Sequence, residues 1–149
     1  MEFAIPHAMV VEHEELHQQL SDVIRIGGKT GAAGEAVAEA LHAHFVAEEE
    51  FALPPLGLLA DLATEKVSPD MAEALAMTDM LEAEMPRMLE EHGVVVAALE
   101  RLVDAATQEN KPEAIRFAGK LRLHAQFEEE VSYPTAILIG KYLKLKLGR

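Results

Sequence analysis

Apolar residues recur every three or four positions along most of the chain, which is the spacing of one face of an α-helix. Four stretches show this pattern, at about residues 9–26, 35–53, 69–107 and 112–143. The connections between them are short or contain only a little further helix. We therefore predict an all-α fold, an up-down antiparallel four-helix bundle with an extra helical segment between helices 2 and 3.

Glycine and proline mark the expected breaks. The glycine-rich run 27–34 is predicted to be a loop, and Pro54-Pro55 to end the second helix. A short helix or turn is expected at about residues 56–65, and a kink or restart at Pro86. The length of 149 residues suits one domain over 1–149, with an arm at 1–8 and a bundle core at about 9–143.

Each of the four stretches carries a histidine on its apolar face. These residues are His13, His44, His92 and His124. Taken singly, a histidine on such a face is usually a core residue that is hydrogen-bonded to a neighbour. Four of them on the inner faces of one bundle would be costly without a common partner. The coincidence indicates a shared site.

The second and fourth stretches also share a repeated phrase. Residues 44–54 read HFVAEEEFALP and residues 124–134 read HAQFEEEVSYP, so the histidine, three glutamates and proline keep their offsets. A histidine and a glutamate four positions apart lie on one helical face. Only Glu48 and Glu128 are therefore in register with their histidines. The same spacing places Phe51 and Val131 on the inner faces.

Charge and composition exclude several classes of partner. The formal net charge of −13 disfavours nucleic acid. No apolar run approaches the roughly 20 residues that span a bilayer, and residues 3–11 make a poor signal peptide. A cytoplasmic location without membrane contact is the expectation. Because the chain has no cysteine, any metal ligand must be imidazole or carboxylate.

Four inward histidines and two inward glutamates form a plausible metal-ligand set. A pair of divalent or trivalent cations would satisfy all six groups, and two carboxylates could bridge them. Imidazole and carboxylate suit iron, manganese or zinc, and ligand chemistry does not choose among these. The predicted metal ligands are His13, His44, Glu48, His92, His124 and Glu128, with His17 as a further candidate.

The arrangement resembles the hemerythrin-like family of HHE cation-binding domains. The matching elements are Glu12-His13, His44-x-x-x-Glu48-Glu49 with Pro54, Glu91-His92, and His124-x-x-x-Glu128-Glu129 with Pro134. They cover roughly residues 9–143, in the family's order. The resemblance implies two iron ions in a non-haem di-iron centre, bridged by two carboxylates and by an oxo or hydroxo group.

The resemblance also implies a function and differs at two positions. It suggests binding of O2, peroxide or nitric oxide for sensing, scavenging or peroxide removal, and whether the chain is an enzyme stays open. Oxygen carriers have a histidine where this chain has Val96, and an aspartate five residues after the last histidine, where this chain has Glu129. The alternatives are iron buffering without turnover and a structural metal site. Partner proteins are not indicated.

Four other features of the sequence bear on the choice of site. His17 lies four residues after His13 and could add a third imidazole to one ion, or instead cap the pocket or bind backbone. A ferritin-like bundle uses Glu-x-x-His, which residues 14–17 and 39–42 match, although the second half of the chain lacks it. Gly28-Lys29-Thr30 resembles a phosphate loop only in part, since no strand precedes it. Tyr133 could lie within reach of the centre.

Overall fold

A computed structural model describes residues 1–149, and it contains helices and no strand. The all-α class and a helical bundle are thereby confirmed. The elements are α1 (His7–Arg25), α2 (Gly28–Ala47), the π-helix η1 (Glu48–Ala52), the 3₁₀-helix η2 (Pro54–Leu58), α3 (Leu59–Ala63), the 3₁₀-helix η3 (Pro69–Glu73), α4 (Ala74–Gln108), α5 (Pro112–Phe127), the π-helix η4 (Glu128–Ser132) and α6 (Tyr133–Leu147).

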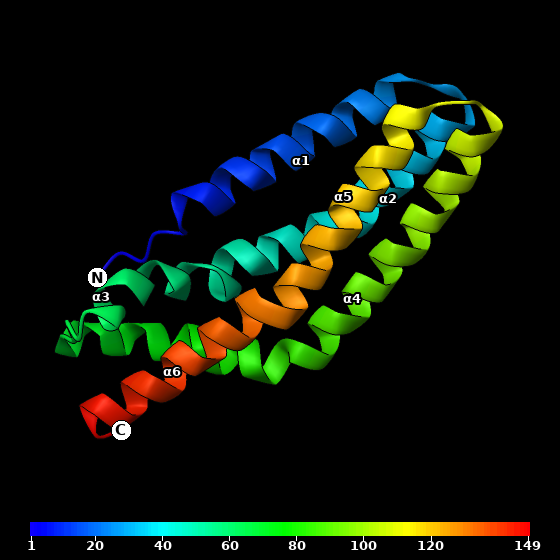
Figure 1. The fold of residues 1–149 in the computed structure, drawn as a ribbon. Helices are drawn as coiled ribbons and strands as arrows, with labels where there is room; N and C mark the ends of the chain where they lie inside the picture. The colour runs from blue at the N-terminus through cyan, green and yellow to red at the C-terminus, as the bar shows by residue number, and fades with distance from the viewer.

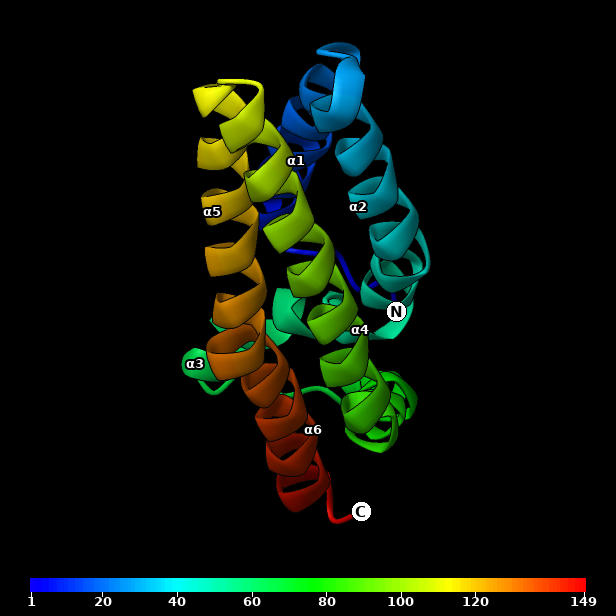
Figure 2. The same cartoon turned by 90° about the vertical axis from the view of Figure 1, so that its right-hand side faces the viewer.

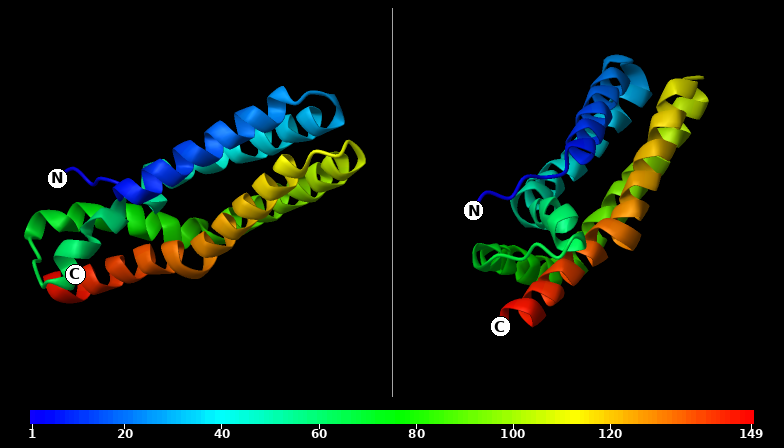
Figure 3. Two further views of the ribbon diagram at one scale, coloured as in Figure 1. Left: turned by 45° about the horizontal axis from the view of Figure 1, so that its top comes forward. Right: turned by 60° about the vertical axis from the view of Figure 1, so that its left-hand side comes forward.

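The long helices are arranged as two hairpins. Figure 1 shows that the turn joining α1 to α2 lies at the same end as the turn joining α4 to α5, and that both chain termini lie toward the opposite end. In both panels of Figure 3, α1 runs beside α2 and α5 runs beside α4. Figure 2 shows α6 continuing the line of α5 below the hairpins. The prediction of an extra helical segment is met by η2, α3, η3 and the start of α4.

The predicted loop at residues 27–34 is wrong, because α2 already begins at Gly28. The glycines allow close packing: a Cβ on Gly31 would lie 2.7 Å from the carbonyl oxygen of Ile24. The helix start is also capped from the other hairpin. Glu109 accepts hydrogen bonds from the amide and the hydroxyl of Thr30, each at 2.6 Å. These contacts offset the usual cost of glycine in a helix, about 1 kcal/mol per residue.

Proline has different effects at three places. Pro54 follows the end of η1, and the chain turns there as predicted. Pro134, its counterpart in the repeat, lies inside a helical path that continues through α6. Pro86 lies inside α4, which is assigned as one continuous helix. Figure 1 shows α4 changing direction partway along its length, and a proline removes one helical hydrogen bond and bends the axis.

Two separate apolar clusters form the interior. One contains 15 buried residues, among them Leu16, Val37, Leu102 and Phe117, and fills the end of the bundle near the turns. The other contains 14 buried residues, among them Leu81, and fills the end near the termini. Judged on length and apolar content together, no helix could cross a membrane. The polar residues of the predicted site lie between the two clusters.

Candidate metal centre

Six polar side chains meet in the buried layer between the two apolar clusters. They come from four elements and two π-helical turns, and their residues are 8% exposed or less except for His124, which is half-buried. The residues are His13 on α1, His44 on α2, Glu48 at the start of η1, His92 on α4, His124 on α5 and Glu128 at the start of η4. The structure thus brings together six of the seven residues singled out from the sequence.

The six side chains form two groups that share both glutamates. The α1/α5 half consists of His13 and His124, and the α2/α4 half consists of His44 and His92. In each half, one atom from each histidine and one oxygen from each of Glu48 and Glu128 lie within 4.8 Å of one another. Either group could hold a metal ion, and two carboxylates common to both could bridge two ions.

The imidazole Nε2 atoms all face these carboxylates. In the α1/α5 half, His13 Nε2 lies 3.5 Å from Glu48 Oε2, and His124 Nε2 lies 3.4 Å from Glu128 Oε1. In the α2/α4 half, His44 Nε2 lies 2.8 Å from Glu48 Oε1 and His92 Nε2 lies 3.5 Å from Glu128 Oε1. Because one nitrogen of each ring faces the centre, the other is free to bind an outer partner.

Three outer carboxylates lie near the Nδ1 atoms of three of these rings. His124 Nδ1 donates to Glu12, His92 Nδ1 donates to Glu129 Oε1 at 2.9 Å, and Glu91 Oε2 lies 3.5 Å from His44 Nδ1. Glu12 and Glu91 each precede a histidine of the set, and each contacts a histidine on the other hairpin. Such outer carboxylates fix ring orientation and raise the basicity of a metal-binding histidine. These glutamates occur in the sequence motifs, but their contacts were not predicted; for Glu12 and Glu91 the Glu-His pairs were the available signal.

The π-helical turns change which residues face the centre. In η1 the amide of Leu53 donates to the carbonyl of Glu48, and in η4 the amide of Tyr133 donates to the carbonyl of Glu128, both five residues back. This wider turn stacks the fifth residue over the shared glutamate. Val131, predicted from α-helical spacing to face inward, is 43% exposed, whereas Tyr133 is fully buried. Such single π-turns often occur at functional sites.

Tyr133 lies against the α2/α4 half. Its hydroxyl donates to Glu48 Oε1 at 2.6 Å and lies 3.0 Å from His44 Nε2 and 3.2 Å from His92 Nε2. Burial and the neighbouring carboxylates raise the pKa of Tyr133 far above its usual value. The corresponding residue of the first repeat is the apolar Leu53.

Crowding and burial shift the pKa values of several groups in the cluster, in both directions. Burial and the nearby Glu128 raise the pKa of Glu48. Burial opposes ionisation of Glu128 too, but the neighbouring imidazoles of His124, His13 and His92 hold its pKa well below the usual value. For His124, burial is outweighed by Glu128 and Glu12, so its pKa rises to about 9. A metal cation would replace these protons as the common partner of the ligands.

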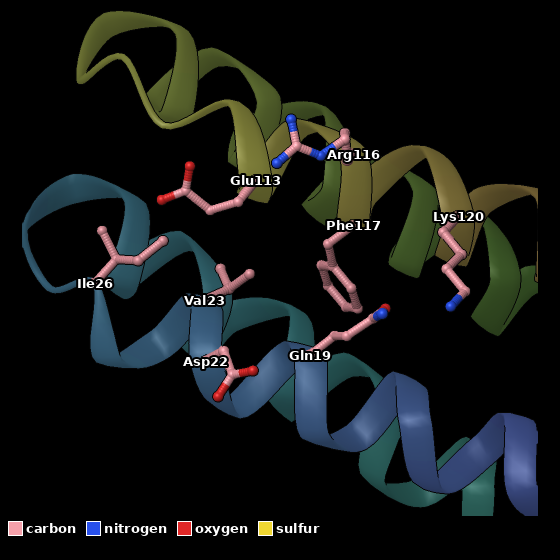
Figure 4. A pocket seen from close by; sticks show the side chains of 8 residues that line it. All are labelled: Gln19, Asp22, Val23, Ile26, Glu113, Arg116, Phe117 and Lys120. Carbon is pink, nitrogen blue, oxygen red and sulfur yellow. The ribbon is translucent and has the colours of Figure 1, made fainter.

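A line of hollows between α1 and α5 leads to the α1/α5 half. The hollow nearest the centre has a volume of about 240 Å³, and its lining includes His13, His124, Leu53, Phe127 and Glu12. A second hollow shares Glu12, His124 and Phe127 with it. The largest, of about 570 Å³, lies nearer the turns, where Phe117 points between the two helices (Figure 4). The largest one contains no histidine, and none of the six clustered residues lines it.

The remaining candidates lie outside the centre. His17 belongs to neither group; its side chain is exposed and its ring packs against Phe45, 4.5 Å between centroids. The Glu-x-x-His pairs at residues 14–17 and 39–42 are also exposed, so no ferritin-like site forms from them. The start of α2, which contains Gly28-Lys29-Thr30, is occupied by the carboxylate of Glu109 rather than being free for a phosphate.

The site therefore belongs to the class of buried histidine-carboxylate clusters inside helical bundles. No family model, curated protein or solved structure matches the chain. The geometry of the cluster is therefore the evidence that it could bind metal.

Proposed function

We propose that the chain is a single hemerythrin-like domain, an up-down antiparallel four-helix bundle with a non-haem di-iron centre. Its function would be to bind O2 or a related small oxidant such as peroxide or nitric oxide. The observation that carries this proposal is the sharing of Glu48 and Glu128 by two groups of histidines. Two carboxylates common to two imidazole pairs are the donor set expected for two neighbouring hard or borderline cations.

The unpartnered atoms of the cluster support the same proposal. Glu48 Oε2 and Glu128 Oε2 are buried and have no hydrogen-bond partner, and the same is true of His124 Nε2. Buried polar atoms without partners are rare in native proteins, and each one calls for a missing ion or another explanation. Here the three atoms face a single place, so the residues present fit a bound cation.

Each residue has a definable part in such a site. The four histidines would bind through Nε2, two to each ion, while Glu48 and Glu128 would bridge. Glu12, Glu91 and Glu129 would hold three of the rings in position through their Nδ1 atoms. Iron held in this way can bind a small oxidant at a coordination position that the protein leaves open.

Metal analysis combined with a visible spectrum tests the proposal. Protein purified under air is expected to contain about two iron ions per chain and to show absorption that changes with oxygen. Glu48→Ala and Glu128→Ala, which each remove a shared ligand, are expected to lose both ions while far-ultraviolet circular dichroism stays helical.

Other results would contradict the proposal. Iron that is held weakly and follows its supply would indicate iron buffering instead. A colourless protein with one tightly bound zinc ion would indicate a structural metal. Retention of two ions by Glu128→Ala would remove the shared carboxylates from the site.

A further inference from the structure

Tyr133 is a buried polar residue at the centre to which the ligand set above gives no part. Its side chain is fully buried, and its hydroxyl lies among Glu48, His44 and His92. All three of these residues belong to the α2/α4 half. A phenol oxygen in this position is able to bind a metal ion as well as to donate a hydrogen bond.

The distances suit a position in the same coordination shell. Two atoms bound to one octahedral ion at about 2.1 Å and 90° apart lie about 3.0 Å from each other. The hydroxyl of Tyr133 lies 2.6 Å from Glu48 Oε1, 3.0 Å from His44 Nε2 and 3.2 Å from His92 Nε2. All three distances are therefore close to the separation expected for two ligand atoms of one ion.

The α1/α5 half has no such oxygen. The residue at the equivalent place in the first repeat is Leu53, which is buried and apolar. Leu53 lines the hollow of about 240 Å³ that also contacts His13 and His124. One half therefore has a protein oxygen close to its histidines, whereas the other has open space beside them.

We propose that the Tyr133 oxygen is a ligand of the ion in the α2/α4 half, so that an added small molecule binds only at the ion in the α1/α5 half. This inference rests on the proposed di-iron function. Ligation would release the phenol proton to solvent, as metal binding does for other protonated ligands. No oxidation or reduction of the tyrosine is involved.

The test uses the full-length chain, freed of metal, reloaded with iron(II) without oxygen and then exposed to air. The wild-type protein is expected to show a phenolate-to-iron(III) charge-transfer band, and resonance Raman excitation within it should enhance tyrosine ring vibrations. Azide should bind with a stoichiometry of one per chain. In Tyr133→Phe the band should vanish, the iron content should stay at two per chain, and azide should bind twice.

Two further variants make the result specific. The chain has only two tyrosines, so in Tyr142→Phe any enhanced tyrosine vibration must come from Tyr133, and the band should remain unchanged. This variant also provides the measurement if Tyr133→Phe does not fold. Leu53→Tyr combined with Tyr133→Phe exchanges the two repeat positions and should restore single azide binding.

The outcomes separate this inference from the proposed function. Two iron ions per chain without a tyrosinate band, or a band that survives in Tyr133→Phe, would overturn the role of Tyr133 and leave the di-iron proposal standing. A chain that retains no iron on reloading would overturn both.

Discussion

The two halves of the centre each contain one histidine of the repeated phrase, but their surroundings differ. In the α2/α4 half, the side chains of His44 and His92 are 1% and 3% exposed, and a tyrosine hydroxyl lies against them. In the α1/α5 half, the side chains of His13 and His124 are each 10% exposed and lie beside a hollow. The α2/α4 half is therefore closed and the α1/α5 half is open, although their ligands are nearly identical. The surrounding residues, rather than the ligands, make the two positions unequal.

Among the tests of this comparison, removal of the metal should have the largest effect on thermal stability. A site filled at 1,000 times its dissociation constant stabilises the folded state by about 4 kcal/mol, which corresponds to roughly 10 °C in thermal midpoint for a chain of this size. Chelation is expected to lower the midpoint by about that amount. The open α1/α5 half should lose its ion first, so the release measured with a coloured chelator should have two phases.

Glu48→Ala, which is expected to lack metal, should show no change on chelation and serves as the control. Equal midpoints with and without metal would contradict a core site, and release in a single phase would contradict the inequality of the halves.

The second prediction concerns the pH dependence of the metal-free protein. The pKa of His124 is raised from 6.5 to about 9 in the folded state. A raised pKa contributes stability that is fully present below pH 6.5 and is lost as the pH rises through about 9, an effect of about 3 kcal/mol. Urea unfolding of metal-free protein between pH 6 and 10 measures it.

His124→Gln should remove most of this dependence, and His92→Gln should leave most of it. The pKa of His92 is also raised, by Glu128 and Glu129 against the effect of burial. If the two variants behaved alike, the proton held by the α1/α5 half would not differ from that held by the α2/α4 half.

A smaller effect is expected from the outer carboxylates. Glu12 contacts His124 in the open half, and Glu91 lies near His44 in the closed half. Loss of such a partner typically weakens metal binding tenfold to a hundredfold. Glu12→Gln should weaken one ion and Glu91→Gln the other, as measured by competition with a chelator of known affinity. Glu90→Gln, an exposed neighbour outside the centre, should have no effect. Weakening of the same ion by both variants would contradict the pairing across the hairpins.

The smallest effect should come from His17. Its exposed ring packs against Phe45 and contacts neither metal group. His17→Ala should therefore keep two ions per chain, change azide binding little and shift the thermal midpoint by no more than about 3 °C. Loss of one ion by this variant would show that His17 is a ligand after all.

The sequence predicts the helices and the convergence of the histidines because both follow the regular period of the α-helix. It fails where that period changes. The π-turn η4 places Tyr133 rather than Val131 at the centre, whereas a spacing of 3.6 residues per turn predicts that Val131 faces inward. The glycines at the start of α2 led to the wrong prediction of a loop, because their packing against Ile24 depends on tertiary structure. The unequal environments depend on which loops and helices surround each half, and the repeat itself does not contain that information.

The position of the six polar residues between two apolar clusters has a consequence for unfolding. Each cluster is a hydrophobic core in its own right, and the layer between them is polar. With a metal present, both cores should open together as one cooperative unit. Without it, we expect that one core exchanges its amide hydrogens by opening while the other remains closed. Metal content would then set the size of the cooperative unit as well as its stability.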